Sequence, residues 1–240
     1  MNRDINPQVY ARVGGILYLI MIALGIIEEA FIRGRITVGG DAVATFANLQ
    51  TMEMLWRAGI AIELLMGIIT IVLSVILYVL TRPVQRELAL LALLFGSIAT
   101  AVESAYSMQL VEALFPLGRN AYLTAFTPGQ LQAMTALAMK AHVFGFGVAL
   151  LLFGPFFLVT GYLMFKSGYF PKPLGVLYQL AGLAYMFNGF ALVLAPQFAG
   201  RVFMIIAAPA FLGETSFAVW LLIKGVRIER WRALTSVPAA

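Results

Sequence analysis

Six long apolar runs fill most of this sequence of 240 residues. They cover the windows 13–31, 57–80, 88–115, 134–165, 174–195 and 203–224. About 20 helical residues cross the ~30 Å hydrocarbon core of a bilayer, so each run is long enough to span it. A helix satisfies its own backbone polar groups, which lipid cannot do. The sequence therefore predicts an all-α integral membrane bundle of six transmembrane helices, forming one domain over residues 1–240.

The composition indicates that the lipid bilayer is the main partner, and it excludes several kinds of catalytic and metal site. The chain is 62% hydrophobic and 11% charged, whereas about a quarter of the residues in a soluble domain are charged. The absence of cysteine excludes disulfides and thiolate catalysis, and the single histidine excludes bis-histidine haem and multi-histidine zinc sites within one chain. The basic residues lie at the ends of apolar runs, so we expect no nucleic-acid partner. No cofactor and no particular oligomeric state is predicted.

The distribution of lysine and arginine predicts the orientation in the membrane. Ten of these residues fall on the side of the amino terminus and six on the other side, which favours both termini in the cytoplasm. The first run lacks a small-residue cleavage site and ends in Glu28 and Glu29, so we expect it to remain as the first span. Long outer loops then follow spans one and three. We expect a multi-pass protein of the bacterial plasma membrane.

Two helix starts can be predicted from local sequence. Thr127, Pro128 and Gln130 supply an N-cap, a proline at the first helical position and a glutamine three residues after the cap. Helix four should therefore begin well before its membrane-spanning part. In the first outer loop, Asp41 can cap a short amphipathic helix that carries Phe46 and Leu49.

Glutamates and the only histidine lie inside the apolar runs and are the main functional clue. A charge in hydrocarbon costs at least ~2.5 kcal/mol, so such residues need an interior partner or a wet cavity. Helical spacing puts Glu63 and Glu103 on faces of small and hydroxyl residues, which are expected to face other helices. The members of these faces are Gly59, Gly67, Thr70 and Ser74 on span two, and Gly96, Thr100 and Ser107 on span three.

These residues predict an acidic cavity that is open to the outside. Distances of ~1.5 Å per residue from the outer helix ends place Glu63 and His142 at shallow depth and Glu214 near the midplane. The candidates for ligand or proton binding are Glu63, Glu103, Glu214, His142 and Asn188. The candidates for the cavity mouth are Glu28, Glu29, Arg57 and Lys140.

Three functions are compatible with this pattern. The first is the binding or transport of a proton, an ion or a small cationic or amphipathic ligand. The second is a metal-assisted hydrolase acting on a lipid, with His142, Glu63 and Glu103 as ligands, although no local motif such as H-E-x-x-H supports it. The third is a non-catalytic membrane partner protein in which the buried carboxyls only join helices. The sequence favours a role other than catalysis.

Several short segments, in this order, resemble one known family. They are Arg12-Val13-Gly14-Gly15-Ile16-Leu17-Tyr18, Phe31-Ile32-Arg33-Gly34-Arg35, Tyr78-Val79-Leu80-Thr81-Arg82-Pro83, Lys166-Ser167-Gly168-Tyr169-Phe170-Pro171, Leu174-Gly175-Val176-Leu177 and Leu212-Gly213-Glu214-Thr215-Ser216-Phe217. The chain resembles bacterial multi-pass membrane proteins of the Domain of Unknown Function 4386 family. The resemblance implies a helical integral membrane domain and no agreed activity. Glu214 lies within the last motif, and His142 lies in a segment where similar members look alike, so the resemblance makes each of them a candidate site residue.

Overall fold

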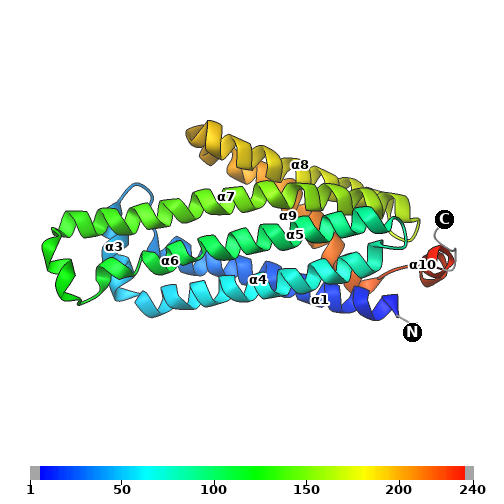
Figure 1. Ribbon diagram of the computed structural model, residues 1–240, viewed down its shortest axis with the longest axis horizontal. Coiled ribbons are helices and arrows are strands. Elements are labelled where there is room, and N and C mark those ends of the chain that lie inside the picture. Colours follow the sequence, from blue (N-terminus) through cyan, green and yellow to red (C-terminus); the bar gives the residue numbers. More distant parts are fainter. Residues whose placement is uncertain (1–5, 236–240) are drawn as a thin grey trace. The chain divides into compact units, whose positions relative to one another are not determined.

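The computed structural model describes residues 6–235, except for the side chains at positions 202, 204, 206 and 207. Every regular element in this part of the chain is a helix (Figure 1). Within the described residues, five stretches are long and apolar enough to cross a membrane: Pro7–Ile36, Glu53–Thr81, Arg86–Leu117, Pro128–Ser167 and Lys172–Leu194. The all-helical, membrane-compatible architecture is therefore confirmed. The sixth predicted span falls on the helix Pro196–Ile223, of which Ala208–Ile223 is the fully described apolar part, so the count of six and the orientation stay predictions.

The elements follow one another with short connections. In chain order they are α1 (Pro7–Ile26), the π-helix η1 (Ile27–Arg33), α2 (Gly34–Ile36), α3 (Ala42–Thr51), α4 (Glu53–Thr81), α5 (Arg86–Tyr106), α6 (Met108–Glu112), the 3-10 helices η2 (Phe115–Leu117) and η3 (Ala121–Ala125), α7 (Pro128–Ser167), α8 (Lys172–Leu194), α9 (Pro196–Ile223) and α10 (Ile228–Thr235).

Both predicted helix starts are confirmed. The backbone N–H of Thr127 donates to Gln130 Oε1 at 2.8 Å, and the backbone N–H of Gln130 donates to Thr127 Oγ1 at 3.3 Å. This reciprocal pair is a capping box, and α7 begins directly after it. Asp41 Oδ1 accepts from the backbone N–H of Ala44 at 2.9 Å and caps α3.

The sequence predicts one regular helix over the third apolar run, but the structure shows a break in it. The α-helix stops at Tyr106 and resumes at Met108, with Ser107 between them. The backbone N–H of Leu110 donates to the Ser107 carbonyl at 3.0 Å, a three-residue spacing that tightens the chain locally. The Leu110 carbonyl in turn accepts from the indole N–H of Trp56 at 2.9 Å. Contacts with another helix therefore stabilise a break that the apolar pattern does not reveal.

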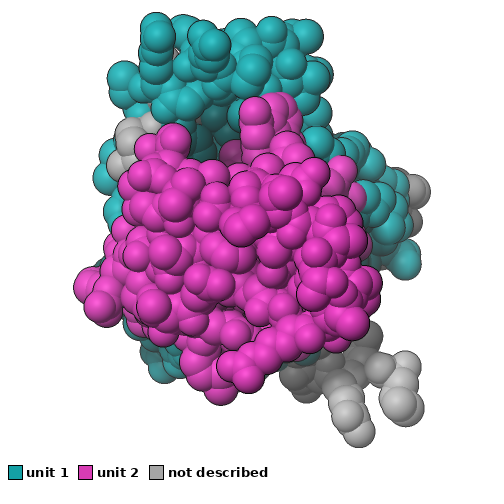
Figure 2. Space-filling view, turned by 90° about the vertical axis from the view of Figure 1, so that its left-hand side faces the viewer, with its two compact units in different colours: residues 1–22, 69–100, 147–240 teal, residues 23–68, 101–146 magenta. Residues whose placement is uncertain are grey.

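The chain divides into two compact units, which Figure 2 distinguishes by colour. Unit 1 comprises residues 1–22, 69–100 and 147–240, and unit 2 comprises residues 23–68 and 101–146. Each unit is assembled from segments that are distant in the sequence. The single helical domain expected from the sequence stays a prediction.

Glycines allow the helices of unit 1 to pack closely. A Cβ atom on Gly15 of α1 would lie 2.5 Å from the backbone nitrogen of Leu222 in α9. A Cβ atom on Gly161 of α7 would lie 2.7 Å from the carbonyl oxygen of Gly175 in α8. Such approaches leave no room for any side chain, and they are typical of helix pairs in membranes.

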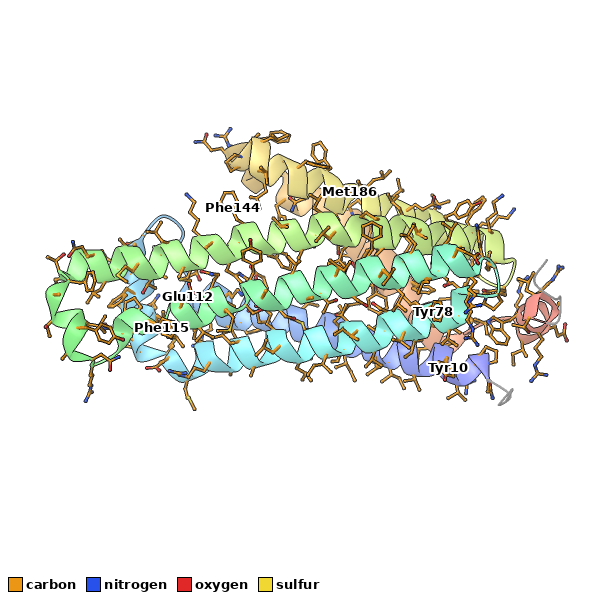
Figure 3. The ribbon with its side chains drawn as sticks, viewed as in Figure 1. Tyr10, Tyr78, Glu112, Phe115, Phe144 and Met186 are labelled. Atoms are coloured by element: carbon orange, nitrogen blue, oxygen red, sulfur yellow. The ribbon has the colours of Figure 1, made fainter. Side chains whose placement is uncertain are left out.

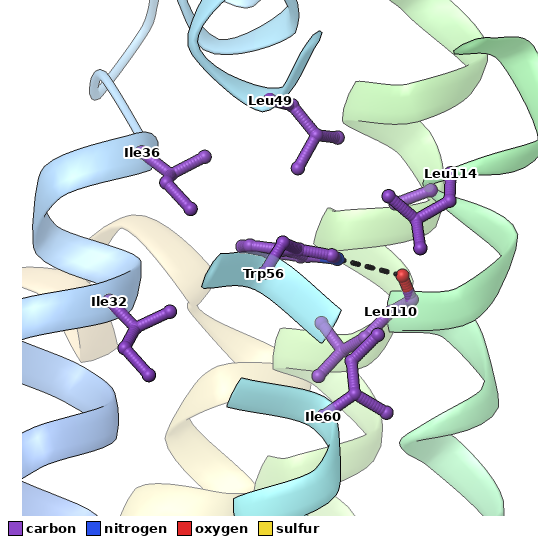
Figure 4. Packing of buried hydrophobic residues seen from close by; sticks show 8 residues of the cluster. Ile32, Ile36, Leu49, Trp56, Ile60, Leu110 and Leu114 are labelled. Atoms are coloured by element: carbon purple, nitrogen blue, oxygen red, sulfur yellow. Dashed lines mark hydrogen bonds between the residues drawn. The ribbon is translucent and has the colours of Figure 1, made fainter. Parts of the chain in front are cut away.

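The core of unit 2 is centred on Trp56. Its ring packs among apolar side chains from η1, α2, α3, α4 and α6 and the residues that follow α6 (Figure 4). The buried members are Ile32, Ile36, Leu49, Trp56, Ile60, Leu110, Ala113 and Leu114. This packing, together with the indole hydrogen bond to Leu110, holds the first turns of α4 against η1 and α6.

Candidate functional site

A π-helix brings the first two charged residues of the site together. Glu28 and Arg33 lie five residues apart within η1. In an α-helix this spacing would separate them by about 140° around the axis. A π-helix has i→i+5 hydrogen bonds, so residues five apart lie close to one another. Arg33 Nε therefore forms an ion pair with Glu28 Oε1.

Glu63 of α4 is the centre of the cluster, and both of its oxygens are bound. Arg33 forms a second ion pair, with Glu63 Oε2. His142 Nε2 of α7 lies 2.9 Å from Glu63 Oε1, and the Ser107 hydroxyl lies 2.5 Å from the same oxygen. Glu63 is 6% exposed and His142 is 2% exposed. We call Glu28, Arg33, Glu63, Ser107 and His142 the Glu63 cluster.

The contacts of His142 indicate which ring nitrogen carries the proton. Arg33 can only donate hydrogen bonds, and its Nη1 lies 3.5 Å from His142 Nδ1. If Arg33 donates to Nδ1, then Nε2–H donates to Glu63 and the imidazole is neutral. With a neutral imidazole, two ionised carboxylates face one guanidinium, and the cluster carries one excess negative charge unless a carboxyl holds an additional proton. With a protonated imidazole, the Nε2 contact is an ion pair with Glu63.

The space beside the Glu63 cluster is narrow. Glu28 and Arg33 line a pocket with Trp56 and Gly59 that is too narrow for a water molecule. A Cβ atom on Gly59 would lie 3.1 Å from Ile32 Cγ2, so α4 and η1 are in close contact. Unit 2 thus encloses the cluster in packed side chains, and a wide cavity open to the outside stays a prediction.

The other predicted site residues of unit 2 lie outside this cluster. Glu103 is half-buried on α5, and its backbone carbonyl lies 3.1 Å from the Ser107 hydroxyl. Glu29, Arg57 and Lys140 are exposed. Arg57 pairs with Glu53 one helical turn away, at 2.7 Å. Of the nine predicted residues, the structure therefore joins Glu28, Glu63 and His142 directly.

Glu214 has a different set of partners, all within unit 1. Tyr18 of α1 donates to Glu214 Oε2 at 2.9 Å, and Tyr185 of α8 donates to Glu214 Oε1. The hydroxyl of Tyr178 lies 2.7 Å from that of Tyr18. Since Tyr18 uses its proton for Glu214, Tyr178 donates to Tyr18. A carboxyl group and three phenols thus form a continuous chain of hydrogen bonds.

Aromatic rings fix this chain in place. The ring of Phe157 lies 4.5 Å from that of Tyr178 and 5.1 Å from that of Tyr185. Asn188, predicted as a wall residue, is 5% exposed on α8, three positions after Tyr185. Glu214 and Asn188 therefore belong to the same unit.

Sequence reasoning missed Arg33 and the three tyrosines as site residues. An α-helical spacing puts Arg33 on a different face from Glu28, so the sequence pattern does not place it in the site. A signal for two of the tyrosines was present in the sequence. Tyr18 and Tyr178 end the matching segments Gly-Ile-Leu-Tyr and Gly-Val-Leu-Tyr, and their hydroxyls hydrogen-bond to each other.

The hypothetical metal ligands are not assembled in the part of the chain that the structure describes. No group of three histidine, cysteine, aspartate or glutamate side chains there could hold a metal ion. Arg33, Ser107 and His142 already engage the carboxylate of Glu63. The hydrolase alternative stays a hypothesis without a visible ligand set.

Comparisons with known proteins place the chain without assigning an activity. It is 29% identical over 162 residues to an uncharacterised protein of Archaeoglobus fulgidus, an alignment that covers 68% of this chain and 80% of that protein. No solved structure matches it significantly. The sequence model of the family described as Domain of unknown function (DUF4386) matches residues 13–225. The resemblance seen in the sequence motifs is therefore confirmed, and the chain belongs to the DUF4386 family.

Proposed function

We propose that this protein is a plasma-membrane protein that binds and exchanges a proton at the Glu63 cluster. The observation that carries the proposal is the sharing of one guanidinium, that of Arg33, by two buried carboxyl groups, Glu28 and Glu63. The five helices that are long and apolar enough to cross a bilayer supply the setting.

The charge balance explains why the cluster would take up a proton. With His142 neutral, ionised Glu28 and Glu63 exceed the single charge of Arg33 by one. An uncompensated charge away from water costs several kcal/mol. Protonation of one carboxyl removes that excess, and the remaining carboxylate keeps Arg33 as its partner. Uptake and release of one proton thus switch the cluster between a neutral and a negatively charged form.

In its negatively charged form, the Glu63 cluster can bind a ligand in place of the proton, which couples ligand binding to proton release. A negative site between apolar helices attracts a small cationic or amphipathic molecule, which would replace the proton as the neutralising group. His142 is the polar side chain that contacts both Glu63 and Arg33, so it is suited to pass a proton between Glu63 and an approaching ligand. The proposed activity is proton-linked binding or transport of such a ligand.

Infrared difference spectroscopy of the full-length protein in lipid tests the proton-binding step. A protonated carboxyl group has a carbonyl band distinct from that of a carboxylate, and a pH jump reveals which bands change. We expect Glu28→Gln and Glu63→Gln each to remove a band present in the wild-type difference spectrum. Glu112→Gln is the matched control, because Glu112 is an exposed glutamate of the same unit (Figure 3).

The same experiment separates proton binding from a purely structural role. If the carboxyls only join helices, the variants lose folding yield, and the folded fraction shows the same carboxyl bands as the wild type. Unchanged spectra in folded Glu28→Gln and Glu63→Gln would therefore refute the proposal. Proton flux into liposomes carrying an entrapped pH dye is the second readout, and Glu63→Gln should slow it while Glu112→Gln should not.

A further inference from the structure

A wide basic pocket lies in unit 1, between the start of α1 on one side and the α9–α10 connection with the start of α10 on the other. Gln8 and Arg12 of α1 line one side, and residues 226–230 line the other. Its volume is about 690 Å³, and it is open to the surface. This volume lies within the range of small-molecule binding sites.

Hydrogen bonds hold the walls of the pocket in place. The side chain of Gln8 donates to the Lys224 carbonyl at 3.0 Å and accepts from the backbone N–H of Val226 at 3.1 Å. Gly225 between them has a φ of +65°, which favours glycine. Its carbonyl accepts from the indole N–H of Trp220 at 2.9 Å. The pocket is therefore framed by an ordered turn.

A buried tryptophan attaches helix α10 to the end of α4. Trp231 is 5% exposed, and its indole N–H donates to the Leu80 carbonyl at 3.2 Å. Tyr169 donates to the same carbonyl at 2.6 Å. The Trp231 bond holds α10, whose first residues line the pocket, against the end of α4.

The pocket carries a net positive charge. Arg12, Arg227 and Arg230 line it with one acidic residue, Glu229, so three positive charges face one negative charge. All three arginines are exposed, and none of them forms an ion pair with another residue of the described range 6–235. The planar fork of arginine matches the oxygen atoms of a phosphate group, which it binds with two parallel hydrogen bonds.

The position of the pocket suits a ligand of the membrane surface. It lies at the start of the apolar helix α1 and just after the end of α9 at Ile223. The ends of membrane-spanning helices lie at the level of the lipid headgroups. Basic pockets at this level bind anionic headgroups. We propose that the pocket binds a phosphate group, carried by an anionic phospholipid or by a free phosphate anion.

Ligand-dependent thermal stabilisation of the full-length protein in detergent tests this proposal, which is independent of proton binding at the Glu63 cluster. The probes are short-chain phosphatidylglycerol, short-chain phosphatidylcholine and inorganic phosphate. A ligand that binds only the folded protein raises its melting temperature with increasing concentration. A basic side chain near an anionic surface contributes about fivefold to affinity, so Arg12→Gln combined with Arg227→Gln should weaken phosphatidylglycerol binding about thirtyfold.

The control removes the same charge elsewhere in unit 1. Arg86→Gln combined with Lys172→Gln replaces two exposed basic residues outside the pocket and should leave the affinity within about twofold. Stronger binding of phosphatidylglycerol than of inorganic phosphate supports the lipid source, and equal binding of the two supports the free anion. The proposal is overturned if neither phosphatidylglycerol nor inorganic phosphate stabilises the protein, if phosphatidylcholine stabilises it as much as phosphatidylglycerol does, or if the control variant weakens binding equally. If the double variant does not fold, Arg230→Gln alone should weaken binding about fivefold.

Discussion

Replacement of Arg33 by glutamine should destabilise the protein in a way that depends strongly on pH. Arg33 is the partner of both Glu28 and Glu63, and its side chain is 20% exposed against 8% and 5% for theirs. Removing one partner of a buried ion pair typically costs about 3–5 kcal/mol, because a charge is left uncompensated. The partial exposure of Arg33 favours the lower end, about 3 kcal/mol at pH 7.

Protonation limits this loss and gives it a pH dependence. An unpaired glutamate can escape its charge by binding a proton, which for an ordinary carboxyl costs about 3.7 kcal/mol at pH 7 and about 1 kcal/mol at pH 5. Stabilisation of carboxylates by Arg33 is present above the pKa of unfolded glutamate and is lost as the pH falls. The difference between wild type and Arg33→Gln should therefore shrink from about 3 to about 1 kcal/mol between pH 7 and pH 5.

Denaturant unfolding in detergent micelles at the two pH values measures this difference. Arg57→Gln is the control, since Arg57 also pairs with a glutamate in unit 2, but its side chain is 53% exposed. An exposed helical pair of this kind contributes about 0.3–0.5 kcal/mol. A loss in Arg33→Gln that equals the loss in Arg57→Gln, or that is the same at pH 5 and pH 7, would show that Arg33 does not balance buried carboxylates.

Two further predictions concern unit 1. Tyr185→Phe removes a donor to Glu214 and should lower the free energy of unfolding by about 1.5–3 kcal/mol, whereas Tyr162→Phe, at a ring that is 40% exposed, should change it little; equal effects in thermal melts would contradict the role of the tyrosine. Gly15→Ala places a methyl group 2.5 Å from a backbone nitrogen and should lower the yield of folded protein on size-exclusion chromatography. Gly129→Ala, with nothing within 4 Å, should not, and an equal yield from both variants would refute close packing at Gly15.

Features that depend on neighbours in the sequence were predictable. The capping box at Thr127 and the cap at Asp41 involve residues three positions apart, so the printed sequence contains all the necessary information. The apolar runs predicted the helices for the same reason. The inward position of Glu63 was also predictable, because helical spacing shows the small residues that share its face.

Features that depend on contacts between distant segments were not predictable in the same way. The break at Ser107 is tied to Glu63 and Trp56, which lie far from it in the sequence. The pairing of Glu28 with Arg33 requires a π-helix, and the apolar pattern contains no signal for one. Tyr185 was not predictable, because a tyrosine within an apolar run resembles any other large ring, whereas Tyr18 and Tyr178 end two matching segments of the sequence.

The π-helix η1 links the charge state of unit 2 to the winding of the backbone. Each hydrogen bond of a π-helix spans five residues, whereas that of an α-helix spans four. A shift of the hydrogen-bond register by one residue would convert η1 to an α-helix. Such a slip rotates everything after it by about 100°, which would swing Arg33 away from Glu28 and move Ile36 out of the Trp56 core. Both ion pairs of Arg33 would break with such a slip, so they stabilise η1 in its π-helical winding.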